Sequence, residues 1–166
     1  MEIRSAALLQ GSFHVRRAER DDVAPIMDLL VSDALGTGPR GGPDFGPGPY
    51  LQAFEAITAD PAQFLAAVDD ASGHLAGTLQ LTLIPCLAAG ALTRLQVEAV
   101  HVRADLRSRG LGAAMMEWAV EQGRSNGAGL VQLMSNGERK AAHRFYRRLG
   151  FEASHVGFKR YLDPLP

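Results

Sequence analysis

Apolar and polar residues alternate in several short stretches of the chain, and this two-residue period predicts β-strands. The clearest example runs through Leu79, Leu81 and Leu83, with polar residues between them, until Pro85 stops it. Turn residues at 69–73 predict a hairpin with the preceding strand. The strands around 78–84 and 92–102 are long enough to pair as a hairpin, which favours a mostly antiparallel sheet. The strands that we expect cover residues 13–17, 64–68, 78–84, 92–102 and 130–134, with two more short strands within 151–161.

Apolar residues three or four positions apart predict four helices. The first two cover residues 23–31 and about 50–58. The third starts after the glycine at 110 and ends at 126–127, and the fourth runs over 138–149. Between the first two helices, ten of the fourteen residues in 36–49 are Gly or Pro, which resists both helix and sheet. We expect a mobile loop there.

The size and composition of the chain narrow its class. A chain of 166 residues, 46% of them hydrophobic, is expected to form one domain over 1–166. Its formal charge of −1 gives no reason to expect nucleic acid or an anionic membrane as a partner. Cys86 is the single cysteine and has no internal disulfide partner, and no Cys/His spacing suggests a metal site. Without a leader pattern or an 18-residue apolar run, we expect a cytoplasmic protein.

A glycine-containing turn lies between the strand that ends near residue 102 and the third helix. Its residues are Arg107-Ser108-Arg109-Gly110-Leu111-Gly112. A helix N-terminus leaves about four N–H groups open and carries about half a positive charge, and glycine lets a bulky anion approach it closely. The P-loop ending is absent, and Met115 stands where the dinucleotide fingerprint needs a small residue. Alone, the turn favours a phosphate site no more than a solvated loop.

The surroundings of this turn add a second motif, Tyr146-Arg147-Arg148-Leu149-Gly150-Phe151. With the order strand, turn, helix, strand, helix, it resembles the GNAT superfamily of N-acetyltransferases over about residues 75–161. The segments 142–146, 149–151, 154–155 and 157–159 look like the bacterial subgroup of aminoalkylphosphonate acetyltransferases and small histone-acetyltransferase-like proteins. The resemblance implies an α/β (α+β) fold whose mixed, mostly antiparallel sheet of about six or seven strands is flanked by about four helices.

The same resemblance implies that the cofactor is acetyl-CoA. Backbone groups of Val100, His101 and Val102 would pair with its pantetheine arm, and the glycine turn would hold its pyrophosphate. Many members of the superfamily carry asparagine seven residues before the motif tyrosine, where this chain has Arg139. The residues expected to bind the cofactor are Val100, His101, Val102, Arg107, Ser108, Arg109, Gly110, Leu111, Gly112, Ala113, Arg139, His143 and Tyr146.

Two residues are candidates for the proton transfers of acetylation. Tyr146 would donate a proton to the departing thiolate by resemblance, although it is also a helix-face aromatic suited to packing beside Phe145. Glu98 is the carboxylate of an otherwise apolar strand segment, where burial would raise its pKa and suit it to act as a base through water. It equally fits an exposed strand face. His101 ranks below Glu98, because alternation puts it on the opposite face unless a bulge intervenes.

The acceptor is expected to be a primary amine of a small molecule, such as an aminoalkylphosphonate. Within the 36–49 loop, Arg40 is a candidate to bind an anionic group and Asp44 an ammonium group. Polyamines, amino acids, aminoglycosides and protein lysines remain alternative acceptors. A non-catalytic acyl-CoA-binding module and a protein-interaction domain are alternative functions. Similar proteins commonly form homodimers through their last strands.

Overall fold

The computed structural model describes residues 1–32, 46–160 and 162. The chain divides into two compact units, Met1–Leu133 and Met134–Pro166, and each is described by itself. Arg40, Asp44 and most of the loop expected at 36–49 lie outside the described residues.

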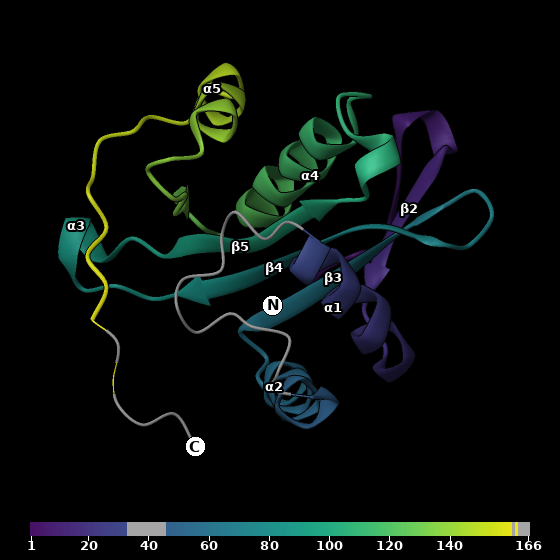
Figure 1. The fold of residues 1–166 in the computed structure, drawn as a ribbon. Coiled ribbons are helices and arrows are strands. Elements are labelled where there is room, and N and C mark those ends of the chain that lie inside the picture. The colour runs from purple at the N-terminus through teal and green to yellow at the C-terminus, as the bar shows by residue number, and fades with distance from the viewer. Residues whose placement is uncertain (33–45, 161, 163–166) are drawn as a thin grey trace. The chain divides into compact units, whose positions relative to one another are not determined.

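The first unit is built on one six-stranded sheet (Figure 1). Neighbouring strands from β1 to β5 are antiparallel, and β6 joins β5 in parallel. The spatial order of the strands follows their order in the chain. Four antiparallel pairs and one parallel pair confirm the mixed, mostly antiparallel sheet. The strands are β1 (Ala6–Leu8), β2 (Phe13–Arg17), β3 (Gln63–Asp70), β4 (Leu75–Ile84), β5 (Arg94–Val102) and β6 (Leu130–Leu133).

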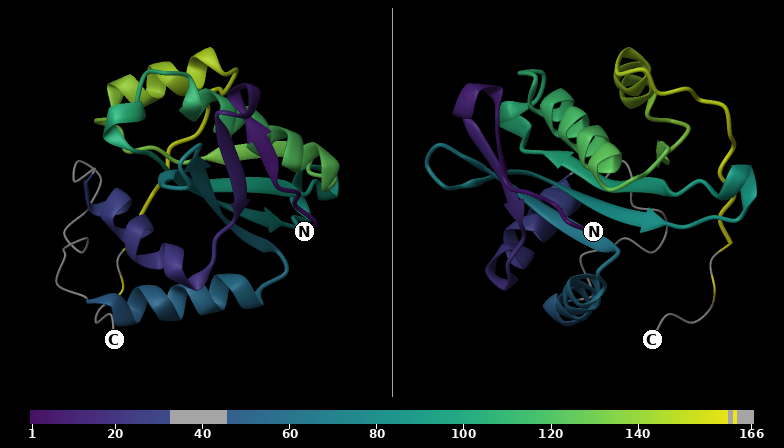
Figure 2. Two further views of the ribbon diagram at one scale, coloured as in Figure 1. Left: turned by 90° about the vertical axis from the view of Figure 1, so that its right-hand side faces the viewer. Right: turned by 180° about the vertical axis from the view of Figure 1, so that it is seen from behind.

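Helices lie on both faces of this sheet. Helix α4 (Leu111–Ser125) packs on one face, and α1 (Val23–Ser32) and α2 (Pro47–Ala59) pack on the other, as the turned views show (Figure 2). We call these the α4 face and the α1 face. The shorter elements of the first unit are α3 (Ala88–Ala91), η1 (Leu9–Gly11), η2 (Arg20–Asp22) and η5 (Ala104–Leu106). The second unit contains α5 (Lys140–Arg148).

The α4 face holds the main hydrophobic core. Alternation turns Leu79 and Leu81 of β4 toward it, where α4 covers them with fully buried Met115 and Met116. Burying each of these side chains contributes about 1.5–3 kcal/mol relative to exposure. Backbones also come close there, because a Cβ on Gly77 would lie 2.9 Å from the backbone oxygen of His101. Glycine is therefore required at the point where β4 meets the end of β5.

The α1 face carries a smaller core over β3. Ile26 of α1 packs with Ala18 and Ala67, and Leu30 and Phe54 close the cluster from the two helices. The turn η2, which leads directly into α1, is held at its start by two hydrogen bonds: the Glu19 N–H donates to Asp22 Oδ2 at 2.7 Å, and the Asp22 N–H donates to the backbone oxygen of Glu19 at 3.0 Å. Toward β5, the residues on this face become polar.

Three expectations need correction. Helix α2 begins at Pro47, inside the segment expected to be a loop, because proline in a first helical turn has no N–H bond to lose. No strand forms over the described residues of 151–161, where no neighbouring described strand takes up the backbone hydrogen bonds. Strand β1 and the four-residue α3 were not expected, since both are too short to show a period.

Candidate active site

A bulge interrupts β5 beside Glu98. Gln80 of β4 lies opposite Glu98 and Thr78 lies opposite His101, so one residue of β4 faces two residues of β5. The two residues are Ala99 and Val100, and Ala99 has φ of +51°, which residues other than glycine rarely adopt. The extra residue shifts the alternation of the strand by one position.

This bulge brings Glu98 and His101 to the same face of the sheet, because directly opposed cross-strand residues share a face. Simple alternation would have put His101 on the opposite face from Glu98, and a bulge was the exception that the sequence left open. Glu98 is exposed, which is the second of the two possibilities that the sequence left open. His101 is half-buried beside it. Two groups that can carry protons therefore lie on the α1 face at the end of β5.

The strand also offers an open edge beyond the bulge. β5 pairs with β6 only as far as Val97 opposite Leu133, whereas it pairs with β4 to Val102. Past Val97, no strand of the described chain lies against the β6 side of β5. An extended ligand arm can pair with backbone groups along such an edge, as an added strand would. This fits the pantetheine contacts expected at Val100, His101 and Val102.

The glycine turn follows directly. Arg107 Nε donates a hydrogen bond to the carbonyl oxygen of Val102 at 3.0 Å, which ties the turn to the end of β5. Ser108 and Gly110 have φ of +61° and +90°, and Leu111 then enters the core with 1% exposure. Gly112 and Ala113 form the first turn of α4, at intermediate exposure.

The start of α4 is suited to an anion. No side chain caps its first N–H groups, and its first turn contains no acidic residue. Arg107, Ser108, Arg109 and Gly110 are exposed just before it. Open amides, a helix dipole and two guanidinium groups together match what a pyrophosphate requires. The residues present therefore fit the phosphates of coenzyme A.

The remaining expected residues belong to the second unit. Tyr146 of α5 packs edge-on against Phe145 and Phe151, with ring centroids 5.1 and 6.0 Å away. Burial raises the pKa of Tyr146 above its ordinary value, and the charge of Arg139 opposes this shift only in part. The phenol therefore stays protonated at neutral pH and can donate a proton. His143 Nε2 lies 2.9 Å from the carbonyl oxygen of Asn136.

One group of site residues was missed by the sequence analysis. Four glutamines form a row across β3 to β6 on the α1 face, which we call the polar row. Gln80 Nε2 donates to Gln63 Oε1 at 2.7 Å, and Gln132 Nε2 donates to Gln96 Oε1 at 2.7 Å. In the sequence, these glutamines are visible only as polar residues of strands with alternating polarity. The sequence alone does not show which strands are neighbours.

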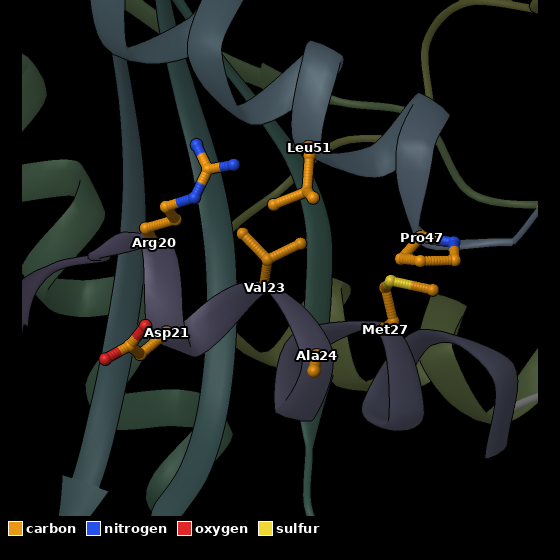
Figure 3. Close-up of a pocket in the computed structure, with 7 residues that line it drawn as sticks. All are labelled: Arg20, Asp21, Val23, Ala24, Met27, Pro47 and Leu51. Atoms are coloured by element: carbon orange, nitrogen blue, oxygen red, sulfur yellow. The ribbon is translucent and has the colours of Figure 1, made fainter.

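The structure also has a hollow that the glutamines of the polar row do not line. It measures about 480 Å³ and separates the start of α1 from the start of α2, where Val23 and Leu51 point toward one another (Figure 3). Among the described residues, none of those expected at the active site lines it. Its lining residues are Arg20, Asp21, Val23, Ala24, Met27, Pro47 and Leu51.

Two features are absent from the described residues. No group of three or more His, Cys, Asp or Glu side chains there is arranged to hold a metal ion. None of the helices there has the length and apolar character needed to cross a membrane.

The mixed sheet with helices on both faces places the chain in the α/β class. Residues 25–151 match the model of the Acetyltransferase (GNAT) family, and the chain belongs to that family. Its members transfer an acyl group, with acetyl-CoA as the family's cofactor. The sequence analysis identified this family and its fold correctly.

Individual relatives add detail. The chain is 36% identical over 67 residues to the aminoalkylphosphonate N-acetyltransferase of Salmonella typhimurium, covering 40% of this chain and 44% of that protein. It spans less than half the length of the first two curated relatives it matches.

Solved structures confirm the fold. A transcriptional regulator from Bacillus halodurans C-125 superposes with a TM-score of 0.82 at 31% identity, covering 89% of this chain and 98% of that one. A predicted acetyltransferase with acetyl-CoA from Clostridium acetobutylicum gives a TM-score of 0.71 at 12% identity, covering 90% and 96%. At that lower identity, the likeness shows the fold alone.

Proposed function

We propose that the chain, as one domain over 1–166, transfers the acetyl group of acetyl-CoA to a primary amine of a small molecule. The bulge in β5 carries this proposal. It gathers Glu98 and His101 on one face, next to an open strand edge and an uncapped helix start. Family membership supports the acyl transfer, and the arrangement of these residues supports its direction toward an amine.

When bound, acetyl-CoA supplies a thioester whose acetyl carbon forms a bond to the amine nitrogen as its bond to sulfur breaks. Backbone groups of Val100, His101 and Val102 hold the extended arm. The amides and side chains of the segment 107–113 hold the pyrophosphate. Arg139 and His143 contribute further contacts to the cofactor from the second unit.

Two proton transfers complete the proposed reaction. Glu98 accepts the proton of the substrate ammonium through a water molecule, since its exposed carboxylate is open to solvent and to substrate. Tyr146 donates its phenolic proton to the sulfur, because its raised pKa keeps the phenol neutral. His101 remains a second candidate for the base, since the bulge places it beside Glu98.

The acceptor that we propose is a small primary amine of the aminoalkylphosphonate kind. The identity to the Salmonella typhimurium protein supports this class. Arg40 and Asp44 stay candidates for binding its charged groups, in a segment outside the described residues.

We also propose a cytoplasmic homodimer that uses neither nucleic acid nor a membrane. The net charge of −1 supports the lack of an anionic polymer partner. Val156 and Phe158 support self-association, because these apolar residues are 78% and 93% exposed. Light scattering over a range of protein concentrations tests the dimer, and a constant monomer mass would refute it.

Thiol release from acetyl-CoA in the presence of different amines tests the main proposal. We expect release to depend on a small primary amine such as 2-aminoethylphosphonate, and to be slower with spermidine or a lysine peptide. Binding of acetyl-CoA without release for any amine would point to a non-catalytic module. No binding at all would point to an interaction domain.

Variants of the two proton-transfer residues test the mechanism. Glu98→Gln and Tyr146→Phe are each expected to lower kcat about 10²–10⁴-fold, the usual contribution of one acid or base. The dissociation constant of acetyl-CoA should change little for Glu98→Gln, because its role concerns the amine. If Glu98→Gln keeps full activity and His101→Gln loses it, then His101 is the base.

A further inference from the structure

Arg94 begins β5 on the same face as the polar row. Alternation from Leu95 and Val97, which are buried under α4, turns Arg94 to the α1 face with Gln96. Its Nε is buried, and no hydrogen-bond acceptor or carboxylate among the described residues contacts its guanidinium. A buried N–H donor normally has an acceptor. The Nε of Arg94 lacks one within the described part of the protein, although the residue as a whole is partly exposed.

Gln96 presents a second donor of the same kind. The residue is only 7% exposed, and its Oε1 accepts a hydrogen bond from Gln132. That bond fixes the orientation of the amide and leaves Nε2 buried with no acceptor in the described structure. Two neighbouring positions on one strand face therefore hold donors that need an oxygen acceptor. Native proteins rarely leave such groups unmatched, and each case calls for an explanation.

The position of these donors relative to Glu98 suggests what they bind. Residues along a strand rise about 3.3 Å each, so Gln96 lies about 7 Å and Arg94 about 13 Å from Glu98 along β5. All three side chains share the α1 face, and long side chains shorten these separations. An acceptor molecule with its amine at Glu98 can thus extend its other end toward Gln96 and Arg94.

We propose that Gln96 and Arg94 bind an acid group of the acceptor, which makes the acceptor an anionic primary amine. This inference rests on the proposed acetyl transfer, because it places the amine at Glu98. The planar guanidinium of Arg94 pairs with two oxygens of a phosphonate or carboxylate, and the Gln96 amide donates to one of them. Gln132 positions Gln96 and does not touch the acid group.

Matched amines test the substrate class. We expect kcat/KM for 2-aminoethylphosphonate or β-alanine to exceed that for ethanolamine, which has no acid group, by at least tenfold. The first two compounds distinguish a phosphonate from a carboxylate site. Equal values for all three would overturn the proposal while leaving acetyl transfer itself intact.

The variant Arg94→Gln tests the residue. It should raise KM for the acidic amines about 10- to 100-fold and leave KM for ethanolamine within about twofold, so that the preference disappears. The matched control is Arg124→Gln, which removes the same charge from an exposed arginine on α4, on the opposite face of the sheet. An unchanged preference in Arg94→Gln would exclude Arg94 from the site.

A binding measurement separates this inference from the proposed function. Calorimetric titration of 2-aminoethylphosphonate into the protein saturated with coenzyme A needs no turnover. Weaker binding by Arg94→Gln and by Gln96→Leu, at an unchanged or higher Tm, supports the site even if no acetyl transfer is found. A lower Tm with unchanged binding in both variants would make the two residues structural and overturn the inference.

Discussion

At the scale of single residues, the expected cofactor region concentrates unusual backbone. Ala99, Ser108 and Gly110 all adopt left-handed φ values within twelve residues of one another. Glycine takes this conformation without strain, whereas alanine and serine do so at a cost of about 1–2 kcal/mol each. Strained backbone persists where the surrounding structure enforces it, and it gathers at functional sites. Here the conformation of Ala99 accompanies the one-residue shift in β5, and those of Ser108 and Gly110 set the direction in which α4 starts.

Gly110→Ala is expected to weaken both the fold and the binding of acetyl-CoA. The added Cβ would meet only Leu9 Cδ2, at 3.9 Å, so backbone strain and not a clash is the cause. A strain of about 1–2 kcal/mol corresponds to a Tm lower by about 2–8 °C for a chain of this size. The dissociation constant of acetyl-CoA should rise at least tenfold, as measured by calorimetry.

The matched control for Gly110→Ala is Gly73→Ala in the hairpin between β3 and β4. Gly73 has φ of +78° and, like Gly110, has room for a Cβ. It should lower Tm by a similar amount and leave the affinity for acetyl-CoA unchanged. If both variants bind acetyl-CoA normally, the glycine turn does not hold the cofactor.

At the scale of elements, the sequence predicted regular structure well and irregular structure poorly. The alternation through Leu79 and Leu81 and the spacing after Gly110 predicted β4 and α4, because burial on one face imposes a period. The sequence allowed for a bulge in β5 but did not locate it, since neither glycine nor proline marks it and alanine occupies the left-handed position. The polar row could not be predicted for another reason, because its glutamines come together only when strands far apart in sequence pair.

One ionic cluster joins three elements of the first unit. Arg16 of β2 binds both carboxylate oxygens of Asp22 in η2, at 2.6 and 2.9 Å, and binds Asp69 of β3 at 2.7 Å. Burial acts to raise the pKa of Asp22, but hydrogen bonds from Arg16 and from the Glu19 N–H outweigh it and hold the pKa below its ordinary value. The cluster therefore sets where the helix α1 begins.

Asp22→Asn is expected to lower the free energy of unfolding by about 1–3 kcal/mol at pH 7, because it removes charge-assisted bonds to a partly buried arginine. A carboxylate with a lowered folded-state pKa contributes stability above its unfolded pKa of about 3.9, and loses it as the pH falls through the folded value. Urea titrations at pH 7 and pH 3 should therefore show a smaller difference between variant and parent at the lower pH.

The exposed pair Arg20–Glu55 provides the comparison for Asp22→Asn. Its side chains are 62% and 59% exposed, so Glu55→Gln should change stability by no more than about 1 kcal/mol. A gap between Asp22→Asn and the parent that stays constant from pH 7 to pH 3 would contradict the role given to Asp22.

At the scale of the whole molecule, the charge is nearly balanced, yet the proposed cofactor site is locally cationic. The chain has 17 basic and 18 acidic residues, while the uncapped start of α4 follows exposed Arg107 and Arg109. Long-range steering by net charge is therefore weak, and attraction of the phosphates depends on groups at the turn itself. Such local attraction between exposed charges is screened by salt within about 10 Å at 0.1 M.

Saturating acetyl-CoA is expected to raise the Tm of the whole protein. A ligand at one hundred times its dissociation constant stabilises the folded state by about 2.7 kcal/mol, or about 5–10 °C for a chain of this length. The shift should shrink as NaCl rises from 0.05 to 0.5 M, and it should depend less on salt in Arg107→Gln and Arg109→Gln. Arg124→Gln, which changes the net charge equally, should behave as the parent does. A shift independent of salt in every variant would mean that the arginines of the turn do not contact the phosphates, and that the backbone amides of α4 alone bind them.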